Sequence, residues 1–343
     1  MTDAQQYLVT GASGFVGRRV VAALLDGGAR VVAFDRDPIP APPDQEPGQK
    51  SGQNLRTIRG DLRDTDSLAA AAAGCDAIVH LASVVRVLRG GSAELRAINI
   101  GGTDNALAAG RRCGVRRFVY VSSASVVYEG RDIENGDETL PYPPRFFAPY
   151  AETKRIAEER VLGSDGQGGM RTTALRPHVV FGPGDTRLVP TVLAHLSGRL
   201  RLVIGDESKL SDFTYVDNVV DSVLLADRAL ADAAPAGGRA YFITNGEPLP
   251  HWEFFRRILR PLNRPMPGPA LPYPIAYAAA WISEKLAGIG INPDTSFTPF
   301  SVKYLSTHHY FSHARATREL GYRPRVAMDE AIARTVAALR IAR

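Results

Sequence analysis

A tyrosine and a lysine stand four residues apart, Tyr150 and Lys154, at the start of a segment whose pattern predicts a helix over 151–162. Side chains four residues apart lie on the same face of a helix, so the phenol and the amine can address one point. A nearby positive charge favours phenolate and is expected to lower the tyrosine pKa from its usual value near 10. Tyr150 is therefore a candidate general acid or base at neutral pH.

Hydroxyl side chains follow a predicted strand at 118–121. Ser122, Ser123 and Ser125 all come directly after it, where they can hydrogen-bond the oxygen of a bound substrate. We take Ser123 as the catalytic hydroxyl. Ser122 and Ser125 are the alternatives, and a simple cap at the end of the strand is the structural explanation.

A glycine-rich turn joins the first predicted strand, 7–10, to the first predicted helix. Glycines there let the backbone turn tightly and approach a pyrophosphate, while the helix N-terminus offers free N–H groups to the anion. A tight turn that binds nothing is the alternative. The residues expected to contact a dinucleotide here are Gly11, Ser13, Gly14, Phe15, Val16 and Gly17.

Asp35 closes the second predicted strand, where a carboxylate accepts hydrogen bonds from the ribose hydroxyls of adenosine. Its charge would repel a 2′-phosphate, which favours NAD over NADP. Arg36 favours NADP instead, because a guanidinium can bind a 2′-phosphate. NAD is therefore the expected cofactor, and NADP stays open.

Further cofactor contacts are expected where the third and fourth predicted strands end, because ligands of open parallel sheets bind at that edge. Ordinary loop chemistry is the alternative for each. These residues are Asp61, Leu62, Leu81, Ala82 and Ser83.

Strand-like runs alternate with helical patterns through the first half of the chain, which predicts right-handed crossovers and a parallel sheet. We expect a Rossmann-like, doubly wound α/β fold with a smaller, mostly α C-terminal substrate lobe. The predicted division assigns 1–177 and 212–245 to the cofactor domain, and 178–211 and 246–343 to the lobe. One long helical stretch is expected at 93–112.

The chain has 343 residues, a net charge of +5 and 45% hydrophobic residues, a composition that excludes a fibrous or disordered protein. Basic residues are scattered, so no nucleic-acid partner is expected. Two cysteines fit a reducing compartment, and no secretory leader or transmembrane segment is predicted, so we expect a cytoplasmic protein. No histidine stands in a metal-ligand spacing, and no metal is expected.

An apolar stretch at 271–289 carries large side chains such as Ile275, Trp281 and Ile282. Three interpretations stay open: packing within its own lobe, lining of a sterol-sized pocket, and weak contact with a membrane surface.

Taken together, the glycine turn, Asp35, Asp61, Ser123 and the Tyr150/Lys154 pair resemble the extended short-chain dehydrogenase/reductase family over nearly the whole chain. Within it the chain is most similar to the 3β-hydroxysteroid dehydrogenase branch, which includes sterol-4-carboxylate 3-dehydrogenases and 2-alkyl-3-oxoalkanoate reductases. The segments that carry this likeness are 122–128, 136–142, 212–218, 309–312 and 320–322.

The resemblance implies further cofactor contacts besides those of Tyr150 and Lys154. A structural role is as good an explanation for His178 as a cofactor contact. These residues are Asn99, Val121, Pro177, His178, Val179 and Val180.

The resemblance also implies an NAD(P)-dependent oxidoreductase that interconverts a secondary alcohol and a ketone on a large apolar substrate, foremost a 3β-hydroxysteroid or sterol. Tyr150 would move the proton, Lys154 would hold the nicotinamide ribose, and Ser123 would orient the substrate oxygen. Alternatives are an NADPH-dependent 2-alkyl-3-oxoalkanoate reductase, a sugar-nucleotide epimerase and a non-enzymatic dinucleotide sensor. A homodimer built on the helices at 93–112 and 150–162 is expected from the same likeness.

Overall fold

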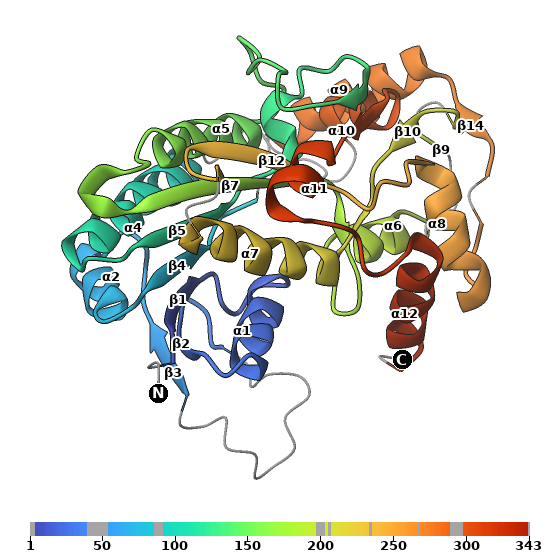
Figure 1. Cartoon of the computed structure of the whole chain (residues 1–343). Helices are drawn as coiled ribbons and strands as arrows, with labels where there is room; N and C mark the ends of the chain where they lie inside the picture. Colours follow the sequence, from blue (N-terminus) through green and yellow to red (C-terminus); the bar gives the residue numbers. More distant parts are fainter. Residues whose placement is uncertain are drawn as a thin grey trace.

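A seven-stranded parallel sheet forms the centre of the molecule, as Figure 1 shows. This computed structural model describes residues 4–39, 54–85, 92–196, 203–204, 207–232, 235–266, 268–288 and 298–341. Across the sheet the strands lie in the order β12 (Arg239–Ile243), β7 (Arg171–Pro177), β5 (Arg117–Val121), β4 (Ala77–His80), β1 (Gln6–Thr10), β2 (Arg30–Asp35) and β3 (Leu55–Arg59). The strand order reverses direction between β1 and β4, which is where open α/β sheets bind their ligands. The predicted doubly wound α/β fold is confirmed.

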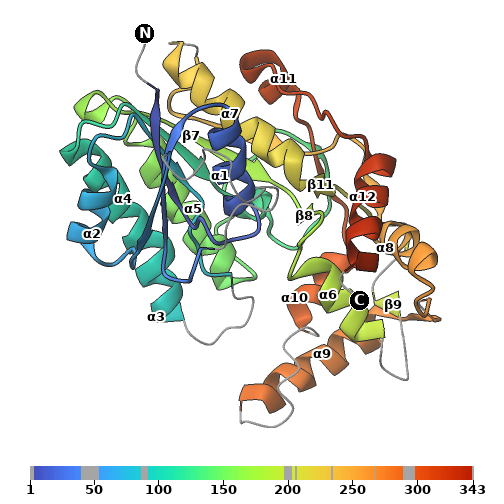
Figure 2. The ribbon, with the colours of Figure 1, turned by 90° about the horizontal axis from the view of Figure 1, so that it is seen from below.

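Helices cover both faces of this sheet, and Figure 2 shows α1 and α7 on one side with α2 and α4 on the other. Their bounds are α1 (Gly17–Asp26), α2 (Thr65–Ala72), α3 (Ser92–Leu95), α4 (Gly102–Arg112), α5 (Pro149–Leu162) and α7 (Val216–Ala231).

Successive strand residues feed two different cores because their side chains alternate between the faces of the sheet. In β1, Val9 packs with Val20 of α1, whereas Leu8 packs with Leu107 of α4. Both strand residues are fully buried. This explains why β1 reads as a nearly continuous apolar run in the sequence.

The expected single helix at 93–112 is interrupted. A π-helical turn, Arg96–Gly101, separates α3 from α4. Wider turns of this kind are often found at functional sites. Here the turn carries Asn99, whose side chain is buried.

The C-terminal half adds helices around an apolar cluster of its own, which includes Phe181, Phe213 and Phe254. The Phe213 and Phe254 rings stack with their centroids 3.7 Å apart. The helices of this half are α6 (Leu188–Leu196), α8 (His251–Leu259), α9 (Tyr273–Gly288), α10 (Pro299–Leu305), α11 (Ala314–Leu320) and α12 (Met328–Ile341). The boundary between a cofactor domain and a substrate lobe stays a prediction.

Short strands complete the fold in three small sheets. They are β6 (Ile133–Gly136), β8 (Val180–Phe181), β9 (Val203–Ile204), β10 (Leu210–Ser211), β11 (Thr214–Tyr215), β13 (Leu249–Pro250), β14 (Ala270–Leu271) and β15 (His309–Phe311). Short helical turns lie at Ala124–Val127, Gln167–Gly169 and Arg260–Leu262.

Most of the apolar stretch at 271–289 forms α9 (Tyr273–Gly288), which packs through its small residues Ala276 and Ala280, and residue 289 lies outside the described residues. Its large side chains Ile275, Trp281 and Ile282 are 57%, 52% and 53% exposed. Packing within the lobe is therefore the wrong interpretation for these three, while pocket lining and membrane contact stay predictions. Within the described residues, no helix combines the length and apolar character that crossing a bilayer requires.

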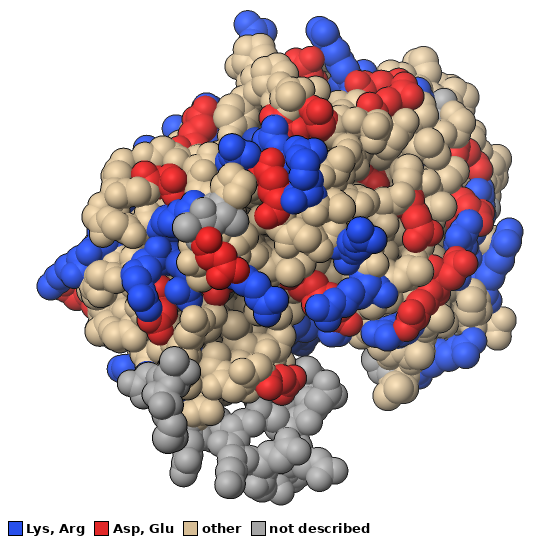
Figure 3. Space-filling view, viewed as in Figure 1, with Lys and Arg blue, Asp and Glu red and all other residues tan. Residues whose placement is uncertain are grey.

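Acidic and basic side chains are interleaved over the face drawn in Figure 3. Many are paired across short distances, as between Arg116 and Asp76 at 2.6 Å. The small positive net charge is therefore not gathered into one patch on this face.

Candidate active site

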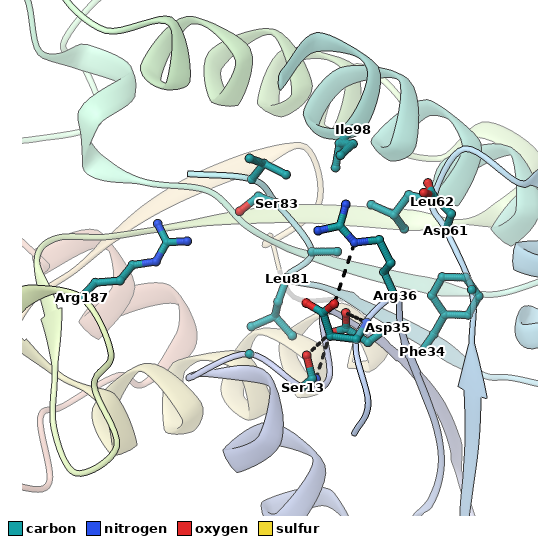
Figure 4. A pocket seen from close by; sticks show the side chains of 16 residues that line it. Ser13, Phe34, Asp35, Arg36, Asp61, Leu62, Leu81, Ser83, Ile98 and Arg187 are labelled. Carbon is teal, nitrogen blue, oxygen red and sulfur yellow. Dashed lines mark hydrogen bonds and ion pairs between the residues drawn. The ribbon is translucent and has the colours of Figure 1, made fainter. Parts of the chain in front are cut away.

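A cleft of about 260 Å³ opens at the carboxyl ends of β1, β2, β3 and β4, where the strand order reverses (Figure 4). Most of the predicted cofactor residues of the first hundred positions meet there. They are Gly11, Ser13, Gly14, Asp35, Arg36, Asp61, Leu62, Leu81, Ala82 and Ser83.

Six residues of the cleft were not expected from the sequence. Some are sequence neighbours of expected residues, so including one or two more residues at each strand end would have found them. Arg187 is different, because it comes from the start of α6, far along the chain from the strands, and no local pattern marks it. The six are Phe34, Asp37, Gly60, Val84, Ile98 and Arg187.

The glycine turn has the close backbone approaches that a pyrophosphate site needs. Gly11 has φ +72°, and a Cβ there would lie 2.7 Å from the backbone N of Ala82. A Cβ on Gly17 would overlap the carbonyl oxygen of Gly11. Side chains at these positions would fill the turn, and α1 begins at Gly17 with its N-terminus behind it. The turn therefore fits the diphosphate of a dinucleotide.

Asp35 ends β2 and is fixed by the glycine turn. Its Oδ2 accepts hydrogen bonds from the Ser13 backbone N–H at 2.9 Å and from the Ser13 hydroxyl at 2.8 Å. Each carboxylate oxygen can accept more than one bond, so Asp35 retains acceptor capacity for ribose hydroxyls.

Arg36 and Asp61 complete this end of the cleft. The Arg36 side chain is 56% exposed, with its Nε 4.0 Å from Asp37. Arg63 binds Asp61 through two nitrogens, at 2.9 and 2.6 Å, and this hydrogen bonding lowers the pKa of the Asp61 carboxyl to about 2. Asp61 is therefore ionised at neutral pH, with its charge largely balanced by Arg63.

Tyr150 lies in the first turn of α5 and keeps part of its ring accessible to solvent. Burial of the hydroxyl raises its pKa to about 12. The Arg187 guanidinium and hydrogen bonding with the Ser123 and Ser83 hydroxyls act in the opposite direction. Because Ser83 and Arg187 both line the cleft, the phenol stands at its edge.

Lys154 follows one helical turn later and is fully buried. Its Nζ donates a 2.8 Å hydrogen bond to the carbonyl oxygen of Val121 and lies 4.1 Å from the centre of the Tyr120 ring. Burial lowers the pKa of Lys154 to about 7, while Glu158 raises it. Helix α5 thus anchors the amine against the end of β5.

The expected lowering of the Tyr150 pKa by Lys154 is wrong for this geometry. Since burial brings the lysine pKa to about 7, the amine is uncharged at the pH where the phenol ionises. The desolvation of the phenol then dominates, and the cation that favours phenolate is Arg187.

Ser123 is the hydroxyl of the three candidates that faces Tyr150. Its Oγ accepts bonds from the Ser125 backbone N–H at 3.2 Å and from the Ser125 hydroxyl at 2.9 Å. The Ser123 proton is therefore left to donate to another oxygen. The Ser122 hydroxyl is buried without a hydrogen-bond partner among the described residues.

Asn99 holds the loop after β4. Its amide accepts from the Val84 N–H at 2.8 Å and donates to the Val84 carbonyl at 3.0 Å. It also donates to the Thr153 hydroxyl at 3.0 Å. Asn99 thus ties the Ser83–Val84 wall of the cleft to α5 rather than lining the cleft itself.

Several predicted contacts lie outside the residues that line the cleft. His178 is buried, and its Nε2 lies 2.7 Å from the Tyr304 hydroxyl, which favours the structural interpretation. Val179 has φ +37°, an unusual value for a β-branched residue, and its carbonyl accepts from Thr214. The residues that the cleft does not include are Phe15, Val16, Gly17, Asn99, Val121, Tyr150, Lys154, Pro177, His178, Val179 and Val180.

One group of side chains among the described residues could hold a cation: Asp132, Glu134 and His308. The sequence did not single out this group. Asp132 is already paired with Lys209 at 2.9 Å and accepts from the His308 backbone N–H. We assign no metal there.

The site can now be compared with known proteins. A sequence model of the 3-beta hydroxysteroid dehydrogenase/isomerase family matches residues 8–273. The chain belongs to this family. It is 38% identical to a 3-beta-hydroxysteroid dehydrogenase of Mycolicibacterium neoaurum, with 97% of this chain and 90% of that protein covered.

Two further relatives carry different names at the same identity. A sterol-4-alpha-carboxylate 3-dehydrogenase (decarboxylating) of Mus musculus is 38% identical, with 98% of this chain and 91% of that protein covered. A 2-alkyl-3-oxoalkanoate reductase of Stenotrophomonas maltophilia is 38% identical, with 95% and 97% covered.

Among solved structures, the dTDP-glucose 4,6-dehydratase of Streptomyces venezuelae, with NAD bound, superposes with a TM-score of 0.74. It is 25% identical, with 98% of this chain and 97% of that chain covered. The chain thus has the extended short-chain dehydrogenase/reductase architecture, which also occurs in an enzyme named for a sugar-nucleotide substrate.

Proposed function

We propose that the chain is an NAD(P)-dependent oxidoreductase that interconverts a secondary alcohol and a ketone on a large apolar substrate, foremost a 3β-hydroxysteroid or sterol. One observation carries the proposal: Tyr150 stands at the edge of the cleft with Ser123 and Ser83 hydroxyls beside it. The names of the relatives, all of them dehydrogenases or reductases, support the same reaction.

Each residue has one task in this reaction. Tyr150 takes the proton of the alcohol during oxidation and gives it back during reduction. Ser123 donates its hydroxyl proton to the substrate oxygen and so holds that oxygen against the phenol. Lys154, buried beneath the end of β5, would hold the nicotinamide ribose. The bound dinucleotide supplies the hydride chemistry. The protein holds the reactants in position and provides the electrostatic environment.

NAD is the cofactor that the cleft favours. The Asp35 carboxylate at the end of β2 suits ribose hydroxyls and opposes a 2′-phosphate. The NAD bound in the dehydratase of similar fold supports this choice. Arg36 keeps NADP within the proposal, since its exposed guanidinium is free to turn toward a phosphate.

The test is a Tyr150→Phe variant, which keeps the ring and removes the ionisable hydroxyl. Turnover of a 3β-hydroxysteroid should fall at least about 100-fold, because general acid–base catalysis contributes that much or more. NAD binding, measured by calorimetry, should stay within about twofold of wild type. A variant that keeps full turnover would refute the assigned role.

Reduction of a 2-alkyl-3-oxo acid with NADPH is the second candidate, favoured by the Stenotrophomonas relative at the same 38% identity. A panel of steroids and 3-oxo acids, each with both cofactors, separates the two. Turnover of UDP- or dTDP-hexoses in that panel would favour the epimerase instead. An absence of all hydride transfer would favour the dinucleotide sensor.

Three finer statements belong to the same proposal. The substrate side of the cleft is formed by the C-terminal lobe at 178–211 and 246–343. Two chains associate through the helical stretches at 93–112 and 150–162. The protein works in the cytoplasm, consistent with its two unpaired cysteines.

A further inference from the structure

Arg187 reaches the cleft from the start of α6, and its backbone there is fixed. The Asp185 carboxylate accepts hydrogen bonds from the backbone N–H groups of Arg187, Leu188 and Val189 at 2.8, 3.1 and 2.9 Å. This is an N-terminal cap, which satisfies donors that a helix leaves unpaired. The cap fixes the backbone of Arg187, the residue directly before α6, and so sets the direction in which its side chain leaves the backbone.

The turn before this cap is tied to the helix that follows the glycine motif. Arg18 donates to the carbonyl oxygen of Gly184 at 2.8 Å, and Arg19 donates to that of Pro183 at 2.9 Å. Both arginines belong to α1. The segment that carries Arg187 is therefore held in place relative to the cofactor end of the cleft.

The Arg187 side chain crosses the mouth of the cleft. Its Nη1 donates to the carbonyl oxygen of Val85 at 3.2 Å. Figure 4 shows it extending toward Ser83, on the opposite side of the cleft from Asp61. Its charge also acts on the Tyr150 phenol. Arg187 thus stands at the reacting end of the cleft.

No carboxylate pairs with Arg187 within the described parts of the chain. The guanidinium has five N–H donors in a planar fork, and one hydrogen bond to Val85 uses only one of them. The remaining donors suit an anion, best a planar carboxylate bound through both oxygens.

We propose that Arg187 binds a carboxylate of the substrate next to the reacting carbon, so that the preferred substrate is a 3-hydroxy or 3-oxo carboxylic acid rather than a neutral alcohol. This inference rests on the proposed function and narrows its substrate class. A carboxylate anchored here would place the neighbouring carbinol oxygen beside Tyr150 and Ser123. Two relatives have names that describe such acids, in a sterol and in an alkanoate series.

The diphosphate of the cofactor is the other source of an anion. It already has a site at the glycine turn, with Gly11, Ser13 and Gly14 in the wall of the cleft. Arg187 instead donates to the Val85 carbonyl oxygen and extends toward Ser83, at the end of the cleft away from Asp61, which favours the substrate. If Arg187 binds the substrate carboxylate, its loss changes kcat/KM for the acid, whereas if it binds the cofactor diphosphate, its loss changes the KM for NAD. One experiment therefore distinguishes the two.

The experiment compares a 3β-hydroxysteroid 4-carboxylate with its methyl ester, which has the same shape without the charge. In wild type, Arg187→Gln and Arg187→Lys, kcat/KM is measured for both substrates, together with the KM for NAD. Arg318→Gln is the control, since this exposed arginine of α11 pairs with Glu319 and lies outside the cleft.

We expect Arg187→Gln to lower kcat/KM for the acid at least tenfold more than for the ester, with the KM for NAD within about twofold of wild type. Arg187→Lys should recover part of the loss, and the control should change neither substrate. An unchanged ratio of acid to ester overturns the inference. A raised KM for NAD with an unchanged ratio overturns it as well and assigns Arg187 to the cofactor.

A binding measurement keeps this inference separate from the proposed function. With NAD present, the acid should raise the melting temperature of wild type and have little effect on Arg187→Gln. Equal stabilisation of both proteins contradicts the role of Arg187, whatever the turnover. Absence of hydride transfer from acid and ester alike, with binding intact, contradicts the proposed function alone.

Discussion

At the scale of single residues, the electrostatics of the site differ from the usual description of a lysine that activates a tyrosine. Tyr150 has a pKa near 12 and Lys154 a pKa near 7, both because burial disfavours their charged forms. At neutral pH the phenol is therefore protonated. That is the form that donates a proton during ketone reduction.

This protonation state predicts opposite pH dependences for the two directions. Oxidation needs phenolate, whose fraction rises tenfold per pH unit below the pKa, so kcat/KM for the alcohol should rise between pH 7 and 10 with a slope approaching one. Reduction needs the phenol, which is intact throughout that range, so kcat/KM for the ketone should stay flat. Initial rates in both directions test this.

The residual activity of Tyr150→Phe is the control for that measurement and should lose the alkaline rise. A wild-type oxidation rate that is constant from pH 7 to 10 would place the phenol pKa below that range. In that case the charge on Lys154, rather than desolvation, would govern Tyr150.

At the scale of elements, α5 carries a buried ion pair directly beneath its two functional side chains. Glu158 lies one turn after Lys154 and has no exposed surface. Arg176 of β7 donates to it through Nη2 at 2.6 Å, and the Tyr142 hydroxyl donates at 2.6 Å. The glutamate thus joins the helix to the sheet and favours the charged form of Lys154.

Glu158→Gln should destabilise the protein by about 3 kcal/mol or more, because it leaves the Arg176 charge buried without its partner. The neighbouring Glu159 is the matched control. It pairs with Arg155 at 2.6 Å on the partly exposed face of the same helix, and Glu159→Gln should cost about 1 kcal/mol or less. Urea unfolding measures both, and equal costs would contradict the buried pair.

The elements themselves follow closely from the sequence. The predicted strands at 7–10 and 118–121 lie within β1 and β5, because short apolar runs mark buried parallel strands. The π-helical turn around Asn99 was missed, since periodicity does not distinguish one wider turn within a helix. The sequence left the placement of the large side chains of α9 open, because it does not show that the small residues Ala276 and Ala280 are the buried ones.

At the scale of the whole molecule, the sheet brings to one edge residues that lie far apart in the sequence. Residues that end predicted strands, such as Asp35 and Ser83, could be assigned to the cleft because the carboxyl ends of parallel strands share an edge. Arg187 could not, since its position depends on how the turn before α6 is hydrogen-bonded to α1. The burial that sets the Tyr150 and Lys154 pKa values likewise depends on tertiary packing.

The family and the cleft together give the central claim, that hydride leaves the carbinol carbon of an alcohol held beside Tyr150. The most direct measurement uses a 3β-hydroxysteroid deuterated at the carbinol carbon, with NAD in excess. Proton NMR of the reduced cofactor should show deuterium at the nicotinamide C4 position, with one equivalent transferred per ketone formed. Reduced cofactor without deuterium, or ketone formed without reduced cofactor, would contradict the account.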